Sequence, residues 1–536
     1  MQFGPIPSHS AQGAILAHGV RADGVLFKKG RVLSAADIEK LVAAGIRDVV
    51  AARLEENDIG EDEAAARIAR GAAGTVTRIG AAFTGRANLY ATEAGIAVID
   101  TGRVDQLNRV DESITLATLA PFARVEPRQM LATVKIIPFA APKSAVTEAE
   151  RLLAPGPVVR VAPFKPLKAA LISTALPATK PSLLDKNRTA LDERLHAIGS
   201  QVVFERRTEH EPTALAAAIA EARAKGADPI LVFGASAITD RRDVIPAAIE
   251  KAGGRILHFG MPVDPGNLSL LGEVGGTRVI GLPGCARSPK INGFDFVLWR
   301  LAAGLPIDRD SIAAMGVGGL LSEIPTRPQP RDERLLEVPR MPRIGAVILA
   351  AGLSSRMGSN KLLARIGGRA LVRHAAEAAA ASSADPVVVV TGNAGAAVVE
   401  AVAGLPLSVV NNPDFAKGLS TSLRRGLNAL PENCDGALVM LGDMPGVTTA
   451  LIDKLIAAFD PAEDRAICVA TRHGKRGNPV LWARRFFPEM MALEGDVGAK
   501  HLMTLYSELV CEVEAADDGP LTDIDTPEAL AAYEAK

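Results

Sequence analysis

The chain has 536 residues, too many for one hydrophobic core, so we expect about three or four domains. The formal net charge is −1 and aromatic residues make up 4%, which argues against a basic nucleic-acid-binding face or a base-stacking platform. The sequence has no apolar run of membrane-spanning length and no signal-peptide pattern, so we expect a cytoplasmic protein without a membrane partner. The 4 cysteines form no CxxC pair, which favours reduced thiols over a disulfide frame or a zinc site.

The first α/β pattern covers residues 167–305. Apolar runs at 169–173, 229–233 and 279–282 predict strands, and turns of small and polar residues follow them. Such turns, converging at one edge of a sheet, can bind an anionic ligand. Ordinary strand-to-helix connections explain the same pattern equally well.

A segment rich in proline and charge, from Ile324 to Arg343, separates this pattern from the rest of the chain. Such a composition buries little surface and stays extended. We therefore interpret 324–343 as a linker between two α/β units.

The C-terminal unit again alternates strand-like and helix-like runs. We predict strands at 346–349, 387–391, 407–410, 436–441 and 466–470. Ligands in sheets of this kind bind at the carboxyl ends of the strands. The polar motifs of this unit follow its apolar runs, so we expect them to meet at that edge.

A glycine-rich turn follows the first of these strands. Gly352 and Gly358 allow close backbone approach, and exposed backbone N–H groups in such a turn hold phosphate. Arg356 and Lys361 add positive charge against a triphosphate. The glycine spacing matches neither a P-loop nor a Rossmann motif. The alternative is a tight turn with solvated basic residues.

Two acidic sites fall at strand or helix ends. Asp443 follows the strand at 436–441, where a carboxylate can hold Mg²⁺ together with phosphate oxygens. Asp525 precedes Thr526-Pro527, so it is either a helix cap or a second Mg²⁺ ligand, with Asp523 as its rival. The alternative for Asp443 is a turn aspartate that bonds its own backbone.

The order of the motifs LAAGxSxRMGxxK, NPxxxxGLSxSL, GDMP, GNPV, GDxGxK and DIDTP resembles the molybdenum cofactor nucleotidyltransferases over nearly the whole C-terminal unit. The resemblance implies a Rossmann-like nucleotidyltransferase fold for residues 344–536. It implies catalytic roles for Lys361, Asp443 and Asp525, with Mg²⁺ on the two aspartates. The implied nucleotide-binding residues are Leu349, Ala350, Ala351, Gly352, Ser354, Arg356, Met357, Gly358 and Lys361.

The acceptor side of this resemblance lies in Gly418, Ser420, Ser422 and Asn478, although helix capping or a plain turn explains these residues too. Ala351 makes the first motif LAAG, the form of the cytidylyl-transferring relatives, whereas the guanylyl-transferring ones usually have LAGG. The resemblance therefore favours CTP. Asn478 departs from the histidine that cytidylyl members often have, and Met444 is a second departure.

The first α/β pattern resembles the molybdopterin-binding fold of molybdate-insertion and molybdopterin-adenylating proteins, which we assign to residues 167–323. Residues 1–166 more weakly resemble the segment that precedes this fold in insertion proteins. Glu209-His-Glu211 and Pro283-Gly-Cys-Ala286 depart from the family pattern, so we expect binding without insertion or adenylation chemistry. The implied molybdopterin-binding residues are Asn187, Gly234, Ser236, Asp243, Pro265, Gly266, Pro283 and Gly284.

Together these resemblances predict two unrelated α/β units in one enzyme of molybdenum cofactor maturation. It would transfer CMP from CTP to molybdopterin, with Mg²⁺ as cofactor and a client molybdoenzyme as a further partner. Two alternatives stay open. One is a transferase that uses GTP or another phosphorylated acceptor, such as a methylerythritol phosphate. The other is a molybdopterin carrier or chaperone for a molybdoenzyme.

Overall fold

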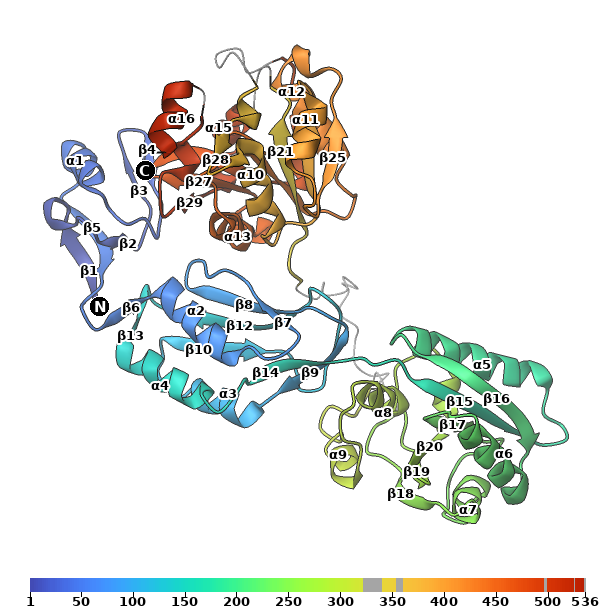
Figure 1. Ribbon diagram of the computed structural model, residues 1–536. Helices are drawn as coiled ribbons and strands as arrows, with labels where there is room; N and C mark the ends of the chain where they lie inside the picture. Colours follow the sequence, from blue (N-terminus) through green and yellow to red (C-terminus); the bar gives the residue numbers. More distant parts are fainter. Residues whose placement is uncertain (322–339, 353–359, 496–498, 525, 535–536) are drawn as a thin grey trace.

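The computed structural model describes residues 1–321, 340–352, 360–495, 499–524 and 526–534. Four units, each with its own sheet or sheets, follow one another along the chain (Figure 1). Within the described residues, we find no helix that combines the length and the apolar character needed to cross a membrane.

The amino-terminal unit, residues 1–53, is a small antiparallel sheet in the order β1-β5-β2. A hairpin of β3 and β4 and one helix complete it, and Leu16, Phe27 and Leu41 lie in its core. The elements are β1 (Gln2–Pro7), β2 (Ile15–Leu16), β3 (Val20–Ala22), β4 (Val25–Phe27), α1 (Ala35–Ala43) and β5 (Asp48–Arg53).

The middle unit, residues 54–163, has a four-stranded sheet in the order β10-β12-β8-β7, a three-stranded sheet in the order β11-β9-β14, and the pair β13-β6. Helix α2 packs on one face of the larger sheet, and α4 packs against α2 and the pair β13-β6 (Figure 1). The strands are β6 (Asp58–Gly60), β7 (Thr77–Ile79), β8 (Arg86–Ala91), β9 (Gly95–Ile99), β10 (Ile114–Thr118), β11 (Arg124–Val125), β12 (Met130–Ile136), β13 (Ala140–Pro142) and β14 (Val159–Pro163). The helices are α2 (Glu61–Ala72), α3 (Thr101–Leu107) and α4 (Lys143–Leu153).

The first α/β unit, residues 164–321, has a six-stranded sheet in the order β16-β15-β17-β20-β19-β18. The first four strands in this order are parallel, and helices cover both faces, so the central strands are apolar runs without alternation. The strands are β15 (Lys168–Ala175), β16 (Gln201–Glu209), β17 (Ile230–Phe233), β18 (Arg255–Phe259), β19 (Leu270–Val274) and β20 (Thr277–Leu282). The helices are α5 (Pro181–His196), α6 (Pro212–Ala224), α7 (Val244–Lys251), α8 (Gly293–Ala302) and α9 (Arg309–Ala313).

The second α/β unit, residues 340–534, has a seven-stranded sheet in the order β25-β24-β21-β26-β28-β27-β29. Its strands are β21 (Ile344–Ala350), β24 (Val387–Thr391), β25 (Ser408–Asn411), β26 (Gly436–Leu441), β27 (Ile467–Arg472), β28 (Lys475–Ala483) and β29 (Val510–Glu514), with a small hairpin of β22 (Arg365–Ile366) and β23 (Arg369–Ala370). Its helices are α10 (Leu371–Ala380), α11 (Gly395–Ala401), α12 (Leu419–Asn428), α13 (Thr449–Ala458), α14 (Phe487–Met491), α15 (Lys500–Leu505) and α16 (Pro527–Glu534).

Strands β25, β24, β21 and β26 are parallel, so their carboxyl ends lie at the same edge of this sheet. All seven residues of β21 are buried. The α/β fold class predicted for both large units is confirmed.

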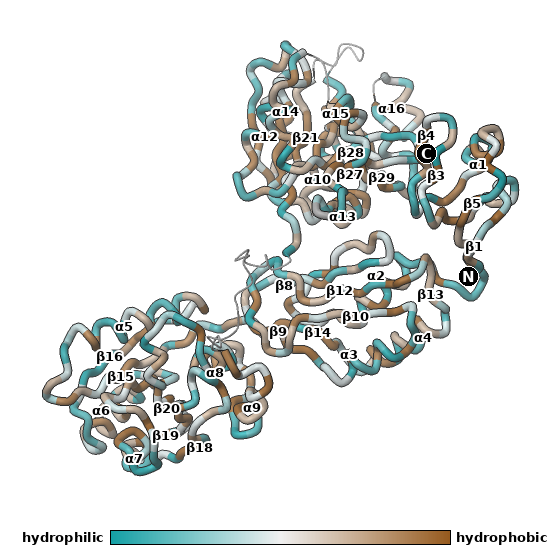
Figure 2. Tube along the Cα trace, turned by 180° about the vertical axis from the view of Figure 1, so that it is seen from behind, coloured by the Kyte–Doolittle hydropathy of each residue, from teal (hydrophilic) through white to brown (hydrophobic). Residues whose placement is uncertain are grey.

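Segments far apart in the chain hold the units together. The amino-terminal unit lies beside β27 and β29 in both views, and Lys28 Nζ donates a hydrogen bond to the Val510 carbonyl (Figures 1 and 2). Arg340 forms an ion pair with Asp435, with two N–O distances of 2.9 and 2.8 Å. Arg128 Nη2 of the middle unit donates to the carbonyl of Pro342 at 2.7 Å. The last residues of the predicted linker are therefore fixed by contacts on both sides.

Candidate active site

The turn after β21 opens at the carboxyl edge of the second α/β unit. Leu349, Ala350 and Ala351 are buried there, and Gly352 is exposed. A Cβ added to Gly392, after the neighbouring strand β24, would lie 2.8 Å from the Ala351 Cβ, so Ala351 fills the space between the two strand ends. Four predicted nucleotide-binding residues, Ser354, Arg356, Met357 and Gly358, lie outside the described residues.

Lys361 and Asp443 meet at this edge. Lys361 Nζ forms an ion pair with Asp443 Oδ2, and the two side chains are 19% and 11% exposed. Asn360 fixes the backbone beside Lys361, because its Oδ1 accepts from Leu362 N at 3.1 Å and its Nδ2 donates to the Asn393 carbonyl at 3.1 Å. A buried charge requires a partner, and each of these two residues is the partner of the other.

The second carboxylate oxygen of Asp443 has no such partner. Oδ1 is buried, and no hydrogen-bond partner for it exists in the described parts of the chain. A buried acceptor without a partner is uncommon in a native structure, so this atom fits a bound cation or donor. No group of three or more His, Cys, Asp or Glu residues with metal-site geometry occurs among the described residues. A Mg²⁺ site needs fewer protein ligands, because phosphate oxygens and water complete it.

The acidic segment near the C-terminus lies against Asp443. Ile524 N donates to the Asp443 carbonyl at 3.1 Å, Ile524 is fully buried and Asp523 is exposed. Close backbone approach permits this placement, because a Cβ on Gly519 would lie 2.1 Å from the Gly446 carbonyl oxygen. Asp525, the predicted second metal ligand, lies outside the described residues.

The predicted acceptor residues at the start of α12 are largely engaged in local structure. Gly418 is the N-cap with φ 111°, a conformation that favours glycine. Ser420 and Ser422 are 2% and 4% exposed. Asn412 Nδ2 donates to Ser422 Oγ at 3.0 Å and to Thr421 Oγ1 at 2.9 Å. Asn412 thus connects the end of β25 to α12, a role that the sequence did not reveal.

Asn478 lies in strand β28, where the sequence suggested a loop. β28 runs antiparallel to β26 with Val480 opposite Val439, so Asn478 is at the end of β28 nearest the carboxyl end of β26. A Cβ on the neighbouring Gly477 would lie 2.1 Å from the Pro520 carbonyl oxygen, which brings this end of β28 against the acidic segment. The sheet therefore places Asn478 on the same edge as Asp443.

The carboxyl edge of the first α/β unit carries a hydroxyl–imidazole network. Thr174 Oγ1 lies 2.8 Å from His210 Nδ1, and His210 Nε2 lies 2.9 Å from Ser236 Oγ. Ala235 N donates to Thr174 Oγ1 at 2.9 Å. Burial lowers the pKa of His210, and the nearby Asp243 carboxylate opposes that shift. The structure thus joins the predicted Ser236 to Thr174, which the sequence did not single out.

The other predicted residues of this unit have different surroundings. Asn187 is 2% exposed, and its Oδ1 has no partner among the described residues; the same holds for Ser173 Oγ. Asp243 accepts backbone hydrogen bonds from Asp240 and Thr239 at 2.8 and 2.6 Å, which lower its pKa. The Gly234 carbonyl accepts from Arg287 Nη2 at 2.8 Å.

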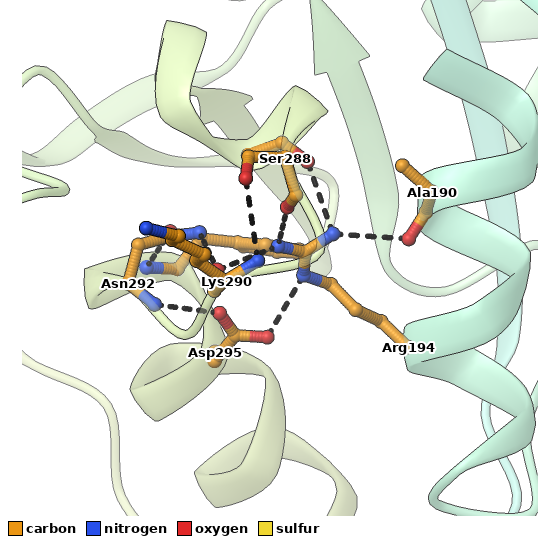
Figure 3. A network of polar contacts seen from close by, with 8 residues as sticks. Ala190, Arg194, Ser288, Lys290, Asn292 and Asp295 are labelled. Atoms are coloured by element: carbon orange, nitrogen blue, oxygen red, sulfur yellow. Dashed lines mark hydrogen bonds and ion pairs between the residues drawn. The ribbon is translucent and has the colours of Figure 1, made fainter. Parts of the chain in front are cut away.

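A buried arginine organises the loop after Pro283-Gly284 (Figure 3). Arg194 Nε donates to Asp295 Oδ1 at 2.9 Å, and its remaining nitrogens donate to the carbonyls of Ala190, Ala286, Ser288 and Lys290. Gly293 N donates to the Pro265 carbonyl at 2.9 Å, and a Cβ on Gly266 would lie 2.4 Å from that nitrogen. The predicted Pro265-Gly266 turn is thus packed against the start of α8.

The four cysteines are free, but two of them are neighbours. Cys468 on β27 and Cys511 on β29 are paired in register on adjacent parallel strands. The contact with Cys511 and burial raise the pKa of the Cys468 thiol. Spacing along the chain gave no indication of this pair.

Parallel strands with a lysine–aspartate pair at their carboxyl edge are typical of an α/β enzyme, and the comparisons with known proteins make it a nucleotidyltransferase. Residues 346–510 match the family model described as the MobA-like NTP transferase domain. Residues 171–302 match a probable molybdopterin binding domain, and residues 5–53 match a domain of unknown function, DUF8806.

The chain belongs to the MobA-like NTP transferase family through its second α/β unit. It is 32% identical over 200 residues to the purine catabolism protein PucB of Bacillus subtilis, covering 35% of this chain and 95% of that protein. It is 27% identical over 190 residues to the molybdenum cofactor cytidylyltransferase of Escherichia coli, covering 35% and 94%. A solved nucleotidyl transferase from Methanothermobacter thermautotroptrophicus aligns with 24% identity and a TM-score of 0.33, covering 36% and 96%.

Proposed function

We propose that the second α/β unit transfers CMP from CTP to the terminal phosphate of molybdopterin and releases pyrophosphate. An acceptor phosphate oxygen would form a bond to the α-phosphorus, and the bond between the α-phosphorus and the bridging oxygen of pyrophosphate would break. The observation that carries the proposal is the Lys361–Asp443 pair, in which the buried Asp443 Oδ1 has no hydrogen-bond partner among the described residues.

The residues of this edge divide the work. Lys361 and Arg356 would neutralise charge on the departing pyrophosphate, and the turn from Leu349 to Gly358 would hold the triphosphate through backbone N–H groups. Asp443 and Asp525 would hold Mg²⁺, which stabilises charge on the phosphates when bound. Fixed positions and electrostatic stabilisation would supply most of the rate, without a covalent enzyme intermediate.

The choice of CTP rests on the LAAG form of the motif with Ala351, and the relative named a cytidylyltransferase supports it. Gly418, Ser420, Ser422 and Asn478 would line the acceptor side. Because Ser422 already accepts from Asn412, we assign it a positioning role for the start of α12.

The first α/β unit would bind molybdopterin. The family match over residues 171–302 and the unpartnered Asn187 Oδ1 and Ser173 Oγ support this role. We propose that the chain consists of an N-terminal segment (1–166), a molybdopterin-binding domain (167–323), a linker (324–343) and a nucleotidyltransferase domain (344–536). The two proposed sites are then on one chain. Covalent linkage would raise the effective concentration of the pterin at the transferase.

Pyrophosphate release from each of the four nucleoside triphosphates, with and without molybdopterin, tests the proposal. We expect release only when CTP and molybdopterin are both present. Release from GTP, or with a methylerythritol phosphate as acceptor, would favour the alternative transferase. Tight molybdopterin binding without turnover of any nucleotide would indicate a carrier or chaperone for a client molybdoenzyme.

A further inference from the structure

A cavity of about 1100 Å³ lies between the middle unit and the second α/β unit. On the side of the second α/β unit, Pro342, Ser383 and Asp435 line it, and these residues precede strands β21, β24 and β26. The cavity is therefore at the amino edge of the sheet, whereas Lys361 and Asp443 are at the carboxyl edge. In both ribbon and tube views, α13 faces the sheet that carries β8 across this region (Figures 1 and 2).

The wall on the side of the middle unit is one face of the four-stranded sheet. Alternate residues of β8, namely Arg86, Asn88 and Tyr90, line the cavity, while Ala87 and Leu89 belong to the core on the opposite face. On β12, Lys135 is directly opposite Arg86 and also lines the cavity. The strand register thus gathers polar side chains on a surface that the neighbouring unit covers.

Two buried polar atoms of this face have no hydrogen-bond partner in the part of the chain that the structure describes. Asn88 Nδ2 donates to Tyr90 Oη at 3.0 Å, but in the described residues nothing bonds to the buried Asn88 Oδ1. Thr133, directly opposite Asn88 on β12, has a buried Oγ1 that is unpartnered in the same sense. A buried atom of this kind requires an explanation. Asn88 lines the cavity, so a ligand with an N–H or O–H group there would provide one for its Oδ1.

The charged groups around these atoms have both signs. Lys29 and Arg86 line the cavity, and Lys29 Nζ lies 6.0 Å from the centroid of the Phe139 ring. Lys135 Nζ lies 3.9 Å from Glu61 Oε2. Burial raises the pKa of Glu61 to about 7. The remaining acidic residues of the wall are Asp435, Asp453, Asp460 and Glu463. Arg340 forms an ion pair with Asp435, and Arg465 forms ion pairs with Asp460 and Glu463.

The apolar part of the wall suits a flat ring. Phe83, Tyr90 and Phe139 line the cavity together with Met130 and Pro138. Ligand sites of about 300–1000 Å³ are usually apolar with a few polar groups, so the cavity can accommodate a nucleotide-sized molecule. The combination of aromatic rings, hydrogen-bonding atoms and cations is what a phosphorylated heterocycle with amino groups requires.

We propose that this cavity is a second ligand site, for a phosphorylated aminated heterocycle of the nucleotide or pterin type, in which Arg86, Lys135 and Lys29 receive the phosphate and Asn88 and Glu61 the ring's polar groups. The site is distinct from the candidate active site. It does not depend on which nucleotide that site uses.

The test is calorimetric titration of the full chain with CTP, GTP and molybdopterin separately. Besides the molybdopterin bound by the first α/β unit, at least one of these probes should bind at a further site that the Lys361→Ala variant retains. In the Lys361→Ala background, Arg86→Ala should weaken that binding about tenfold, because a charge-assisted contact is lost. Asn88→Leu, which keeps the size of the side chain, should weaken it less.

Arg109→Ala is the matched control, because Arg109 is an exposed arginine of the same unit that does not line the cavity. An unchanged unfolding midpoint must accompany each variant, and Asn88→Leu supplies a second test if Arg86→Ala unfolds. The inference is overturned if no probe binds the Lys361→Ala protein. It is also overturned if neither Arg86→Ala nor Asn88→Leu changes the affinity of any probe that this protein still binds. Loss of turnover in Lys361→Ala tests the proposed transferase separately, so either idea can fail alone.

Discussion

The two α/β units share one arrangement of strands and turns, but the polar groups that it brings together differ. Each brings parallel strands to a common edge and follows them with turns of small residues, but the edges carry different chemistry. In the second unit the edge holds a partly buried ion pair, Lys361–Asp443, and one carboxylate oxygen of Asp443 has no hydrogen-bond partner in the part of the chain that the structure describes. In the first unit it holds neutral groups, Thr174, His210 and Ser236, joined by hydrogen bonds.

This difference suggests that the second α/β unit carries the transfer activity and that the first α/β unit binds molybdopterin. A fixed pair of opposite charges stabilises the changing charge of a phosphoryl transfer, whereas neutral hydrogen-bonding groups select a polar ligand without supplying such stabilisation. We therefore expect substitutions at the second edge to reduce turnover and those at the first edge to reduce molybdopterin affinity. The predictions below test this division, beginning with the largest effect.

Asp443→Asn should reduce the transfer rate at least about a hundredfold, because it removes a charge that metal and lysine both require. The fold should persist, since the substitution preserves the shape of the side chain. Turnover over a Mg²⁺ titration is the measurement, and molybdopterin binding by the first unit is the control. Near-normal activity at any Mg²⁺ concentration would contradict the role of Asp443.

CTP should exceed GTP by more than about tenfold in kcat/KM, because a site that hydrogen-bonds one base edge rejects another. The expectation rests on Ala351, whose side chain fills the space beside Gly392. Direct competition of the two nucleotides measures the ratio. Replacing Ala351 with glycine should narrow the ratio, and equal use of GTP by the wild type would reject the assignment.

The separation of the two edges can be tested by cutting the chain. Limited proteolysis should cut within 324–339, because segments rich in proline and charge are preferred cleavage sites. Residues 340–343 should resist, since Arg340 pairs with Asp435 and Arg128 holds the Pro342 carbonyl. Arg128→Ala should extend cleavage toward residue 343.

The C-terminal fragment should still transfer CMP to free molybdopterin, because Lys361, Asp443 and Ile524 all follow the cut. The intact chain should outperform mixed fragments at low molybdopterin, and the gap should close at saturation. A folded but inactive fragment would show that the active site uses residues of the N-terminal half.

The sequence predicted the strands that are continuous apolar runs. All five predicted strands of the second unit coincide with β21, β24, β25, β26 and β27 to within two residues at their ends. It did not predict β28, whose Gly477-Asn478-Pro479 is typical of a turn and whose pairing comes from distant strands. It also missed β16, an edge strand with charged residues in its second half.

In the candidate site too, the sequence predicted the local features and missed the contacts between distant residues. Glycine turns and acids after apolar runs are local signals, so Lys361 and Asp443 were predicted from the sequence. The partners that fix them are not local: Asn412 reaches α12 across a turn, and Ile524 reaches Asp443 through close approach of two glycines. Cys468 and Cys511 become neighbours only through strand register. The sheets of residues 54–163 are built from short strands that carry little periodic signal.

The smallest expected effect is on the pH dependence of stability, through His210 at the carboxyl edge of the first α/β unit. Burial lowers the pKa of His210 below its ordinary value of 6.5, although Asp243 opposes this. The unfolded chain therefore binds the proton more readily, so the contribution of His210 to stability is present above pH 6.5 and is lost as pH falls below it. When the pH is lowered from about 7 to about 5, across the ordinary His pKa, the thermal unfolding midpoint should decrease. We expect this decrease to be larger for the wild type than for His210→Gln. Thermal unfolding of both proteins across this range measures the difference, and Asp443→Asn should leave it unchanged. Equal pH dependence in the wild type and His210→Gln would mean that the imidazole is not held neutral between Thr174 and Ser236, and the contrast between a charged and a neutral edge would lose its main support.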